Sequence, residues 1–345
     1  MLFRNTIFCF SFFICSFLIA QEHYITTIAF YNFENLFDCE DDPITFDNDF
    51  LPEGSYSWTK EKLSLKLNNL SHVIFNIGKD ISQKSPVIIG FAEVENRYVL
   101  EELISTNLLT NIDYDIIHEN SPDKRGIDVG LLYDRSRFSV VNYQYHFLEL
   151  FDELSKPLYT RDQLCVSGYL DSELIYVIVN HWPSRRGGEK RSDPKRRNAA
   201  QLTAKILDSI EQITPNPKVL VMGDFNDNPT NKSFKKVLGT RSKKDASCFN
   251  LYNPYETMFL NGQGSLAYRD QWSMFDQILL SSPFLKNKSM QWHYYNAYVF
   301  SEDFLKHDQG KYFGYPQRTF ERGQYIGGYS DHFPVYVYLV KKVSN

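Results

Sequence analysis

The architecture of this chain is decided by the stretch VLVMGDFN, residues 219–226, in which four apolar residues lead directly into Gly223, Asp224 and Asn226. A continuous apolar run this short is typical of a central strand that is covered on both faces. The same pattern occurs in VIIGFAE, residues 87–93, where the apolar run ends at Glu93. Two such strands predict an α/β protein whose sheets place carboxylates at their carboxyl ends, where open α/β sheets bind ligands.

Two long amphipathic segments flank these predicted strands. Residues 59–77 repeat apolar side chains at a spacing of three and four, with Thr59 as the expected N-cap, and residues 192–213 repeat the pattern before Pro215 and Pro217. Further apolar runs predict strands at 25–32, 114–117, 129–133, 138–147, 278–280 and 335–340, and a hairpin that joins 164–170 to 174–180. Interleaved strands and helices favour layered sheets covered by helices. Because no linker-like stretch divides the chain, we expect one domain.

The composition excludes a disordered chain and a globally basic one. Of the 345 residues, 43% are hydrophobic and 23% are charged, which is enough apolar surface for a large core. The net charge is −5, so the overall field does not attract a polyanion. Any affinity for nucleic acid must therefore come from a local basic patch.

The first twenty residues read as a secretory signal peptide. Arg4 precedes an uncharged apolar run over residues 7–19, and Ala20 offers a cleavage site. That run is too short to cross a bilayer comfortably as a helix. A buried N-terminal core helix is the alternative, and the lack of a polar face counts against it. We expect an exported protein, periplasmic or extracellular, with residues 21–345 as its mature chain, no transmembrane anchor and no obligate protein partner.

Two sets of polar residues occur in the same order along the chain. Each set has a carboxylate at a strand end, an Asp that opens an apolar strand, and a His followed by an aromatic residue and Pro. The first set is Glu93, Asp128 and His181, and the second is Asp224, Asp276 and His332. This repetition predicts two related halves that supply carboxylate–histidine couples to one cleft, Asp128 with His181 and Asp276 with His332.

Phosphodiester hydrolysis explains why such residues occur together. A hard cation held by the oxygens of Glu93 and Asp331 would neutralise the phosphate, and magnesium suits these ligands. An Asp–His couple keeps an imidazolium beside a phosphate oxygen. Asp224 and Asn226 would orient the attacking water. Any one of these residues alone is more often structural, so the repeated order is what favours catalysis.

Five segments also match a known family: FYNFENL (30–36), GFAE (90–93), GDFN (223–226), FDQIL (275–279) and SDHFP (330–334). They resemble the endonuclease/exonuclease/phosphatase superfamily, whose fold is DNase I-like. The resemblance implies an α/β fold, a four-layered sandwich of two packed mixed β-sheets flanked by helices, and a phosphoric ester hydrolase that uses Mg²⁺ or Mn²⁺. Residues 32–38, Asp128 after Arg125-Gly126, and Gly327-Gly328-Tyr329 before Ser330 resemble a secreted bacterial subgroup.

The resemblance also assigns roles to residues of this chain. It places Asn32, Glu93 and Asp331 near the metal. It places Asp224 and Asn226 at the water and the phosphate, and it implies that His332 contacts the phosphate and is oriented by Asp276. His181 matches a second active-site histidine of the nuclease and sphingomyelinase branches.

The expected substrate is DNA or RNA, cleaved by a nuclease or phosphodiesterase. A basic segment follows His181, and we expect phosphate contacts from Arg125, Arg185, Arg186 and Arg318. The alternative is that the segment has no binding role and is a solvated loop that leads into a helix. Aromatic residues in 282–328, such as Trp292, Tyr294 and Tyr295, could stack on bases, although such residues are more often core.

Two other functions fit the same residues. One is a phosphomonoesterase or a sphingomyelinase-like lipid phosphodiesterase with the same metal–Asp–His centre. The other is a binding module that has lost catalysis, which is disfavoured because every element of the site is present in the sequence.

Overall fold

Two six-stranded mixed sheets form the centre of the computed structural model, which describes residues 23–245, 250–288 and 290–342. The signal peptide predicted for residues 1–20 lies outside the described residues. The first sheet has the order β13 (His293–Val299), β16 (Val335–Lys342), β1 (His23–Leu36), β2 (Ile88–Val94), β4 (Asp128–Asp134) and β3 (Tyr114–His118). The second has the order β5 (Phe138–His146), β6 (Gln163–Leu170), β7 (Glu173–His181), β8 (Val219–Asp224), β12 (Asp276–Ser281) and β9 (Leu251–Tyr252).

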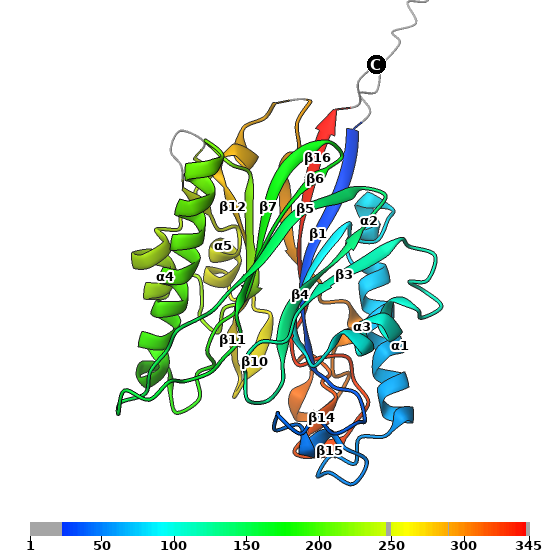
Figure 1. Cartoon of the computed structure of the whole chain (residues 1–345). Coiled ribbons are helices and arrows are strands. Elements are labelled where there is room, and N and C mark those ends of the chain that lie inside the picture. Colours follow the sequence, from blue (N-terminus) through cyan, green and yellow to red (C-terminus); the bar gives the residue numbers. More distant parts are fainter. Residues whose placement is uncertain (1–22, 246–249, 289, 343–345) are drawn as a thin grey trace, which may run out of the picture.

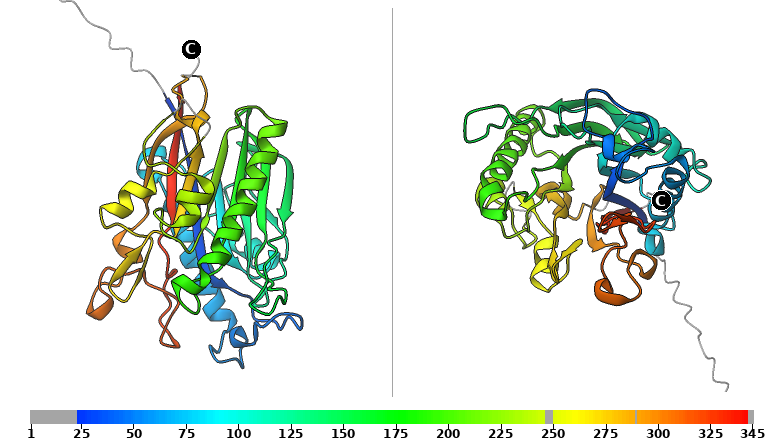
Figure 2. Two further views of the ribbon diagram at one scale, coloured as in Figure 1. Left: turned by 90° about the vertical axis from the view of Figure 1, so that its left-hand side faces the viewer. Right: turned by 90° about the horizontal axis from the view of Figure 1, so that it is seen from below.

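Helices cover the outer faces of both sheets (Figures 1 and 2). The helices α1 (Lys60–Asn76) and α3 (Arg97–Ile104) pack on the first sheet, and α4 (Glu189–Ile213) packs on the second. The predicted four-layered α/β sandwich is therefore confirmed. The described part of the chain also contains α2 (Lys79–Ser82), α5 (Tyr255–Leu260), and two small hairpins, β10 (Leu266–Tyr268) with β11 (Gln271–Ser273) and β14 (Phe320–Glu321) with β15 (Gln324–Tyr325). Short turns of helix lie at 48–50, 233–238, 282–285, 303–305 and 310–312.

The apolar side chains of the central strands contribute to three hydrophobic cores, because they point alternately to the two faces of each sheet. Successive side chains of a strand point to opposite faces. In β1, Ile28 and Phe30 join the core between the sheets, whereas Ala29 and Tyr31 join the core beneath α1 and α3. A third core lies between the second sheet and α4. All four of these β1 side chains are fully buried, as the continuous apolar run predicted.

The two sheets repeat one arrangement of four strands. In the first sheet β1 is parallel to β2, and antiparallel β16 and β4 flank this pair. In the second sheet β7 is parallel to β8, and antiparallel β6 and β12 flank it. The repeat supports the prediction of two related halves, with β4 corresponding to β12.

The long helices follow the predicted periodicity, but one begins earlier than expected. α1 starts directly after Thr59. α4 starts at Glu189 instead of Ser192, with Gly188 as its N-cap. Ser192 therefore lies within the first turn, where its hydroxyl donates to the carbonyl of Gly188. None of the described helices is long and apolar enough to cross a membrane.

The aromatic-rich segment contains a strand that the sequence pattern did not reveal. Residues 293–299 form the edge strand β13, with a register shift between Tyr294 and Asn296 that disturbs its alternation. Trp292 and Tyr294 are buried in the core between the sheets, which leaves neither free to stack on a base.

Candidate active site

The carboxyl ends of the parallel strands gather the polar residues at one end of the sandwich. At the end of β2 the pairing with β4 shifts register between Ala92 and Val94, and Glu93 between them has a φ of +63°. Asn226, just after β8, has a φ of +51°. Such left-handed residues and bulges recur beside active sites, where they redirect side chains out of the ladder.

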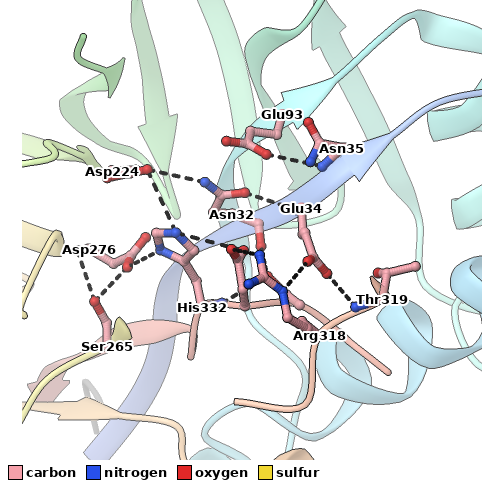
Figure 3. A network of polar contacts seen from close by, with 12 residues as sticks. Asn32, Glu34, Asn35, Glu93, Asp224, Ser265, Asp276, Arg318, Thr319 and His332 are labelled. Atoms are coloured by element: carbon pink, nitrogen blue, oxygen red, sulfur yellow. Dashed lines mark hydrogen bonds and ion pairs between the residues drawn. The ribbon is translucent and has the colours of Figure 1, made fainter. Parts of the chain in front are cut away.

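His332 and Asp276 form the predicted couple. Nδ1 of His332 lies 2.6 Å from Oδ2 of Asp276, and the Ser265 hydroxyl donates to the same oxygen at 2.5 Å (Figure 3). Burial alone would lower the pKa of His332, but the charges of Asp276 and Asp224 outweigh it and raise that pKa well above its ordinary value. The geometry therefore favours an imidazolium whose Nε2 faces the site.

Asp224 lies between two histidines at the centre of the site. Its Oδ2 is 3.5 Å from Nε2 of His181 and 4.0 Å from Nε2 of His332, and it accepts from the side-chain amide of Asn32 at 3.2 Å. The backbone amide of Asn226 donates to Oδ1 at 3.0 Å. Burial raises the pKa of Asp224 to about 7, with the positive charge of His332 opposing this rise. A carboxyl group that titrates near neutral pH suits a general base.

His181 has the opposite electrostatic environment from His332. Burial lowers its pKa well below the ordinary value, and the positive charges of Arg161 and Arg125 lower it further. Its Nε2 also lies 3.7 Å from Oε1 of Glu93, and its Nδ1 is buried and forms no hydrogen bond with the described residues. His181 is therefore held neutral within the site.

The predicted couple of Asp128 with His181 is wrong. Oδ2 of Asp128 lies 3.4 Å from Nε2 of His118, which comes from the neighbouring strand β3, and Oδ1 accepts from the Ser121 amide at 2.8 Å. Oδ1 of Asp128 thus accepts one hydrogen bond, and its Oδ2 faces Nε2 of His118, which forms no hydrogen bond with any described residue. We find no structural support for Asp128 as a catalytic residue.

Arg318 has carboxylate partners that the sequence did not predict. Its guanidinium donates to Oε1 of Glu34 at 3.2 Å (Figure 3). It also donates to Oδ2 of Asp331 at 2.7 Å. Buried Lys66 lies on the other side, with Nζ 3.7 Å from Oε2 of Glu34 and donating to the Thr319 hydroxyl at 2.7 Å. These carboxylates partly neutralise the positive charge of Arg318, which was expected to bind the phosphate of the substrate.

Sequence reasoning missed three of these polar residues, and two of them carried a signal. Glu34 follows Asn32 by two positions within the segment that matches the family. Lys66 interrupts the apolar stripe of α1 between Leu63 and Leu67, where a charge requires a partner. Ser265 comes from an irregular turn and offered no recognisable pattern.

The other predicted phosphate-binding arginines differ in their exposure and in whether they form ion pairs with carboxylates. Arg185 forms ion pairs with Glu189 at 3.0 Å and Asp227 at 3.5 Å. Arg125 lies 3.6 Å from Asp123 and is about half exposed. Arg186 is exposed and forms no ion pair with any described residue. The basic segment is therefore largely neutralised by its own neighbours, and the substrate roles of these arginines stay predictions.

Two groups of side chains have donors close enough to hold a divalent cation. They are Glu93, His181 and Asp224, and Asp224, Asp276 and His332, each with ligand atoms within 4.8 Å of one another. The first group fits better, because Oε1 of Glu93 accepts no hydrogen bond from any described residue, whereas Asp276 and His332 bind each other. Its two carboxylates are the oxygen ligands that a hard cation prefers.

Asp331 and Asn32 belong to neither group. Arg318 occupies Oδ2 of Asp331, and Oδ1 of Asn32 accepts from the Glu34 amide at 2.9 Å. Their predicted places near the metal stay predictions.

The chain matches one sequence family over most of its length and several solved structures in fold. The Endonuclease/Exonuclease/phosphatase family matches residues 27–341. No curated protein sequence matches the chain. The fold is similar to a D. rerio TDP2 humanized by 14 mutations, with 12% identity, a TM-score of 0.54, and coverage of 92% of this chain and 99% of that one.

Two further structures are similar at comparable levels. D. rerio TDP2 complexed with a single-strand DNA product has 13% identity and a TM-score of 0.53, over 91% of this chain and 98% of that one. An endonuclease/exonuclease/phosphatase family protein from Bacteroides thetaiotaomicron has 16% identity and a TM-score of 0.53, over 94% and 98%. Identities this low show a shared fold. The family match over residues 27–341 shows that the chain belongs to the endonuclease/exonuclease/phosphatase family, as a phosphoric ester hydrolase of that type.

Proposed function

We propose that this protein is an exported, divalent-metal-dependent phosphodiesterase that hydrolyses phosphodiester bonds of DNA or RNA. The observation that carries the proposal is the position of Asp224, whose Oδ2 lies 3.5 Å from His181 and 4.0 Å from His332. Burial and nearby arginines keep the first histidine neutral, whereas carboxylates keep the second charged. Groups whose pKa values are pushed apart in one site are typical of acid–base catalysis.

Each residue has a distinct task in this proposal. The His332 imidazolium, oriented by Asp276, binds a non-bridging phosphate oxygen and stabilises the charge that develops on it. Asp224 accepts a proton from the attacking water, and the Asn226 side chain, which donates to the Trp182 carbonyl at 3.0 Å, stays beside it. A magnesium ion held by Glu93 and Asp224 would neutralise the phosphate.

Export is the part of the proposal that rests on residues 1–20 alone. Their short apolar run after Arg4 supports a cleaved signal peptide and a periplasmic or extracellular enzyme. We also propose that residues 21–345 form a single catalytic domain and that the protein belongs to a secreted bacterial subgroup of its family.

Purified protein of residues 21–345 tests the substrate. We expect cleavage of single-stranded or duplex DNA or of RNA with Mg²⁺, and complete loss of cleavage with EDTA. Sphingomyelin and a small phosphomonoester serve as competing substrates. Faster turnover of either one than of every nucleic acid would replace the nuclease proposal with the lipid phosphodiesterase or phosphomonoesterase alternative.

A further inference from the structure

A pocket of about 400 Å³ lies directly beside Asp331 and Arg318. One wall is the turn of the β10–β11 hairpin, and the other is the segment 307–322, which leads into the β14–β15 hairpin. Both hairpins lie at the lower end of the molecule in Figure 1, away from the carboxyl terminus. The pocket therefore adjoins Asp331, whose Oδ1 lies 3.9 Å from Nε2 of His332, and is built by chain segments outside the two six-stranded sheets.

Three tyrosines give the pocket aromatic walls. The rings of Tyr312 and Tyr315 lie 5.7 Å apart at 52°, and Tyr268 is 65% exposed at the rim. Tyr315 is fixed to the opposite wall, because its hydroxyl donates to Oδ1 of Asp270 at 2.7 Å and accepts from the Asp270 amide at 2.7 Å. Arg269 and Asp270 both have left-handed backbones, which makes the hairpin turn tight and holds this wall in place.

Three cations that line the same pocket belong to no salt bridge of the described part of the chain. Arg269, Lys311 and Arg322 form no salt bridge with any described residue, and they lie against tyrosines. Arg322 donates to the Tyr312 hydroxyl at 3.2 Å, Lys311 lies 5.8 Å from the centre of the same ring, and Arg269 lies 5.2 Å from that of Tyr268.

The acidic residues of the pocket are mostly engaged. Asp270 is bonded to Tyr315 and Asp331 to Arg318, which leaves Glu321 as the remaining carboxylate of the lining. In the basic segment after His181, Arg185, Arg196 and Arg197 are paired with acidic residues, whereas Arg186 is exposed and forms no ion pair with any described residue. The pocket differs in grouping three such cations around aromatic rings.

We propose that this pocket binds one nucleotide of a single strand, next to the phosphate that is cleaved. The base stacks on Tyr312 and Tyr268, and its phosphate binds Lys311, Arg269 and Arg322. Aromatic faces interleaved with cations are the usual means of holding single-stranded nucleic acid, and a pocket of this size suits one unstacked base. Bases inside a duplex are stacked on each other, so the pocket favours single strands. This inference rests on the proposed function and adds the subsite and the strand preference.

Binding without metal tests the pocket independently of catalysis. In EDTA, we expect thymidine 5′-monophosphate to bind the protein about tenfold more tightly than inorganic phosphate, measured by calorimetry. Tyr312→Ala and Lys311→Gln should each weaken this binding about tenfold. Lys311 is exposed, so its replacement leaves the fold intact even if Tyr312→Ala is unstable. Tyr169→Ala on β6 and Lys205→Gln on α4 are matched controls at exposed positions away from the pocket.

Cleavage then tests the strand preference. The wild type should cleave a single-stranded oligothymidylate faster than the same sequence in a duplex. Tyr312→Ala and Lys311→Gln should lower the ratio of kcat/KM for this oligonucleotide to that for bis(p-nitrophenyl) phosphate about tenfold, through KM.

The outcomes separate the pocket from the proposed function. If nucleic acid is cleaved but both variants keep wild-type binding and ratios, or if duplex is preferred, the pocket assignment is overturned and the proposed function stands. If the wild type cleaves the small ester and no nucleic acid, the proposed function fails. Equal binding of the mononucleotide and phosphate would then overturn the pocket as well.

Discussion

Two aspartates open corresponding strands of the two sheets and have different partners. Asp276 opens β12 and binds the imidazole of His332, which lies just ahead of β16 in the other sheet. Asp128 opens β4, and its Oδ2 lies 3.4 Å from Nε2 of His118 in its own sheet. Arg161 lies two residues ahead of β6, close to the place that His332 has three residues ahead of β16. Its guanidinium donates to Asp123 at 3.0 Å and to the Trp182 carbonyl at 2.8 Å.

The two sheets repeat the same four-strand arrangement, but only one of the two corresponding aspartates provides an Asp–His couple to the site. In one half, the residue that crosses between the sheets is a titratable imidazole, whereas in the other it is a permanently charged guanidinium. Arg161 contributes to the low pKa of His181, and Asp276 contributes to the high pKa of His332. The half without a catalytic couple thus adds, through Arg161, to the effect of burial that keeps His181 neutral.

The largest expected difference is in kcat, between a variant that lacks His332 and a variant that lacks His118. His332→Gln should lower kcat about a hundredfold or more, because it removes the charged group beside the phosphate. His118→Gln should leave kcat within a few-fold of the wild type, since His118 only supports Asp128. Steady-state kinetics on the best substrate measure both. Comparable losses in the two variants would mean that both halves are catalytic.

The crossing guanidinium should matter for stability. Arg161 and Asp123 are both buried, so Arg161→Met leaves a buried carboxylate with only Arg125 nearby and should cost about 3–5 kcal/mol of unfolding free energy. Arg135→Met, which breaks the exposed pair with Asp113, is the control and should barely change the urea midpoint. If Arg161→Met is as stable as this control, Arg161 does not hold the two sheets together.

Two glycines in the central strands should also respond differently. A Cβ on Gly223 would lie 2.2 Å from the backbone oxygen of Asn180, so Gly223→Ala should cost about 1–3 kcal/mol. A Cβ on Gly90 would meet the flexible side chain of Met222 at 2.5 Å and the Phe30 ring at 3.2 Å but no backbone atom this close, so Gly90→Ala should cost less. Thermal unfolding of the two variants ranks them, and the reverse order would contradict this packing.

The smallest expected effect is on the pH dependence of stability. Because the folded pKa of His332 is raised, its stabilisation is complete below the unfolded value of about 6.5 and is lost as pH rises through the folded pKa. Asp276→Asn removes the main opposite charge. The stability difference between wild type and this variant, measured by urea unfolding in EDTA between pH 5.5 and 9, should therefore shrink as pH rises. A difference that grows over this range would exclude a raised pKa for His332.

Most strands and helices of the four layers could be predicted from the sequence, because buried elements have recognisable apolar patterns along the chain. The apolar runs before Glu93 and Asp224 and the stripes of α1 and α4 identified the strands and helices that build the four layers. The edge strand β13 was missed, because its irregular register and exposed face hide the alternation.

The site was predictable only in part, because its contacts join distant segments. The couple of Asp276 with His332 followed from the repeated order of residues. The same reasoning assigned His181 to Asp128, since it could not reveal that His118 lies on the adjacent strand. The bridge from Glu34 through Arg318 to Asp331 depends on a loop whose path has no periodic signal.

The central claim is that Asp224 lies between one neutral and one charged histidine. Nitrogen-15 NMR of the histidine rings in the metal-free protein, assigned by His181→Gln and His332→Gln, measures both charge states directly. We expect His332 to remain protonated at pH 7.5 and His181 to remain neutral at pH 6. Titration of His332 at or below pH 6.5, or protonation of His181 above it, would contradict the account.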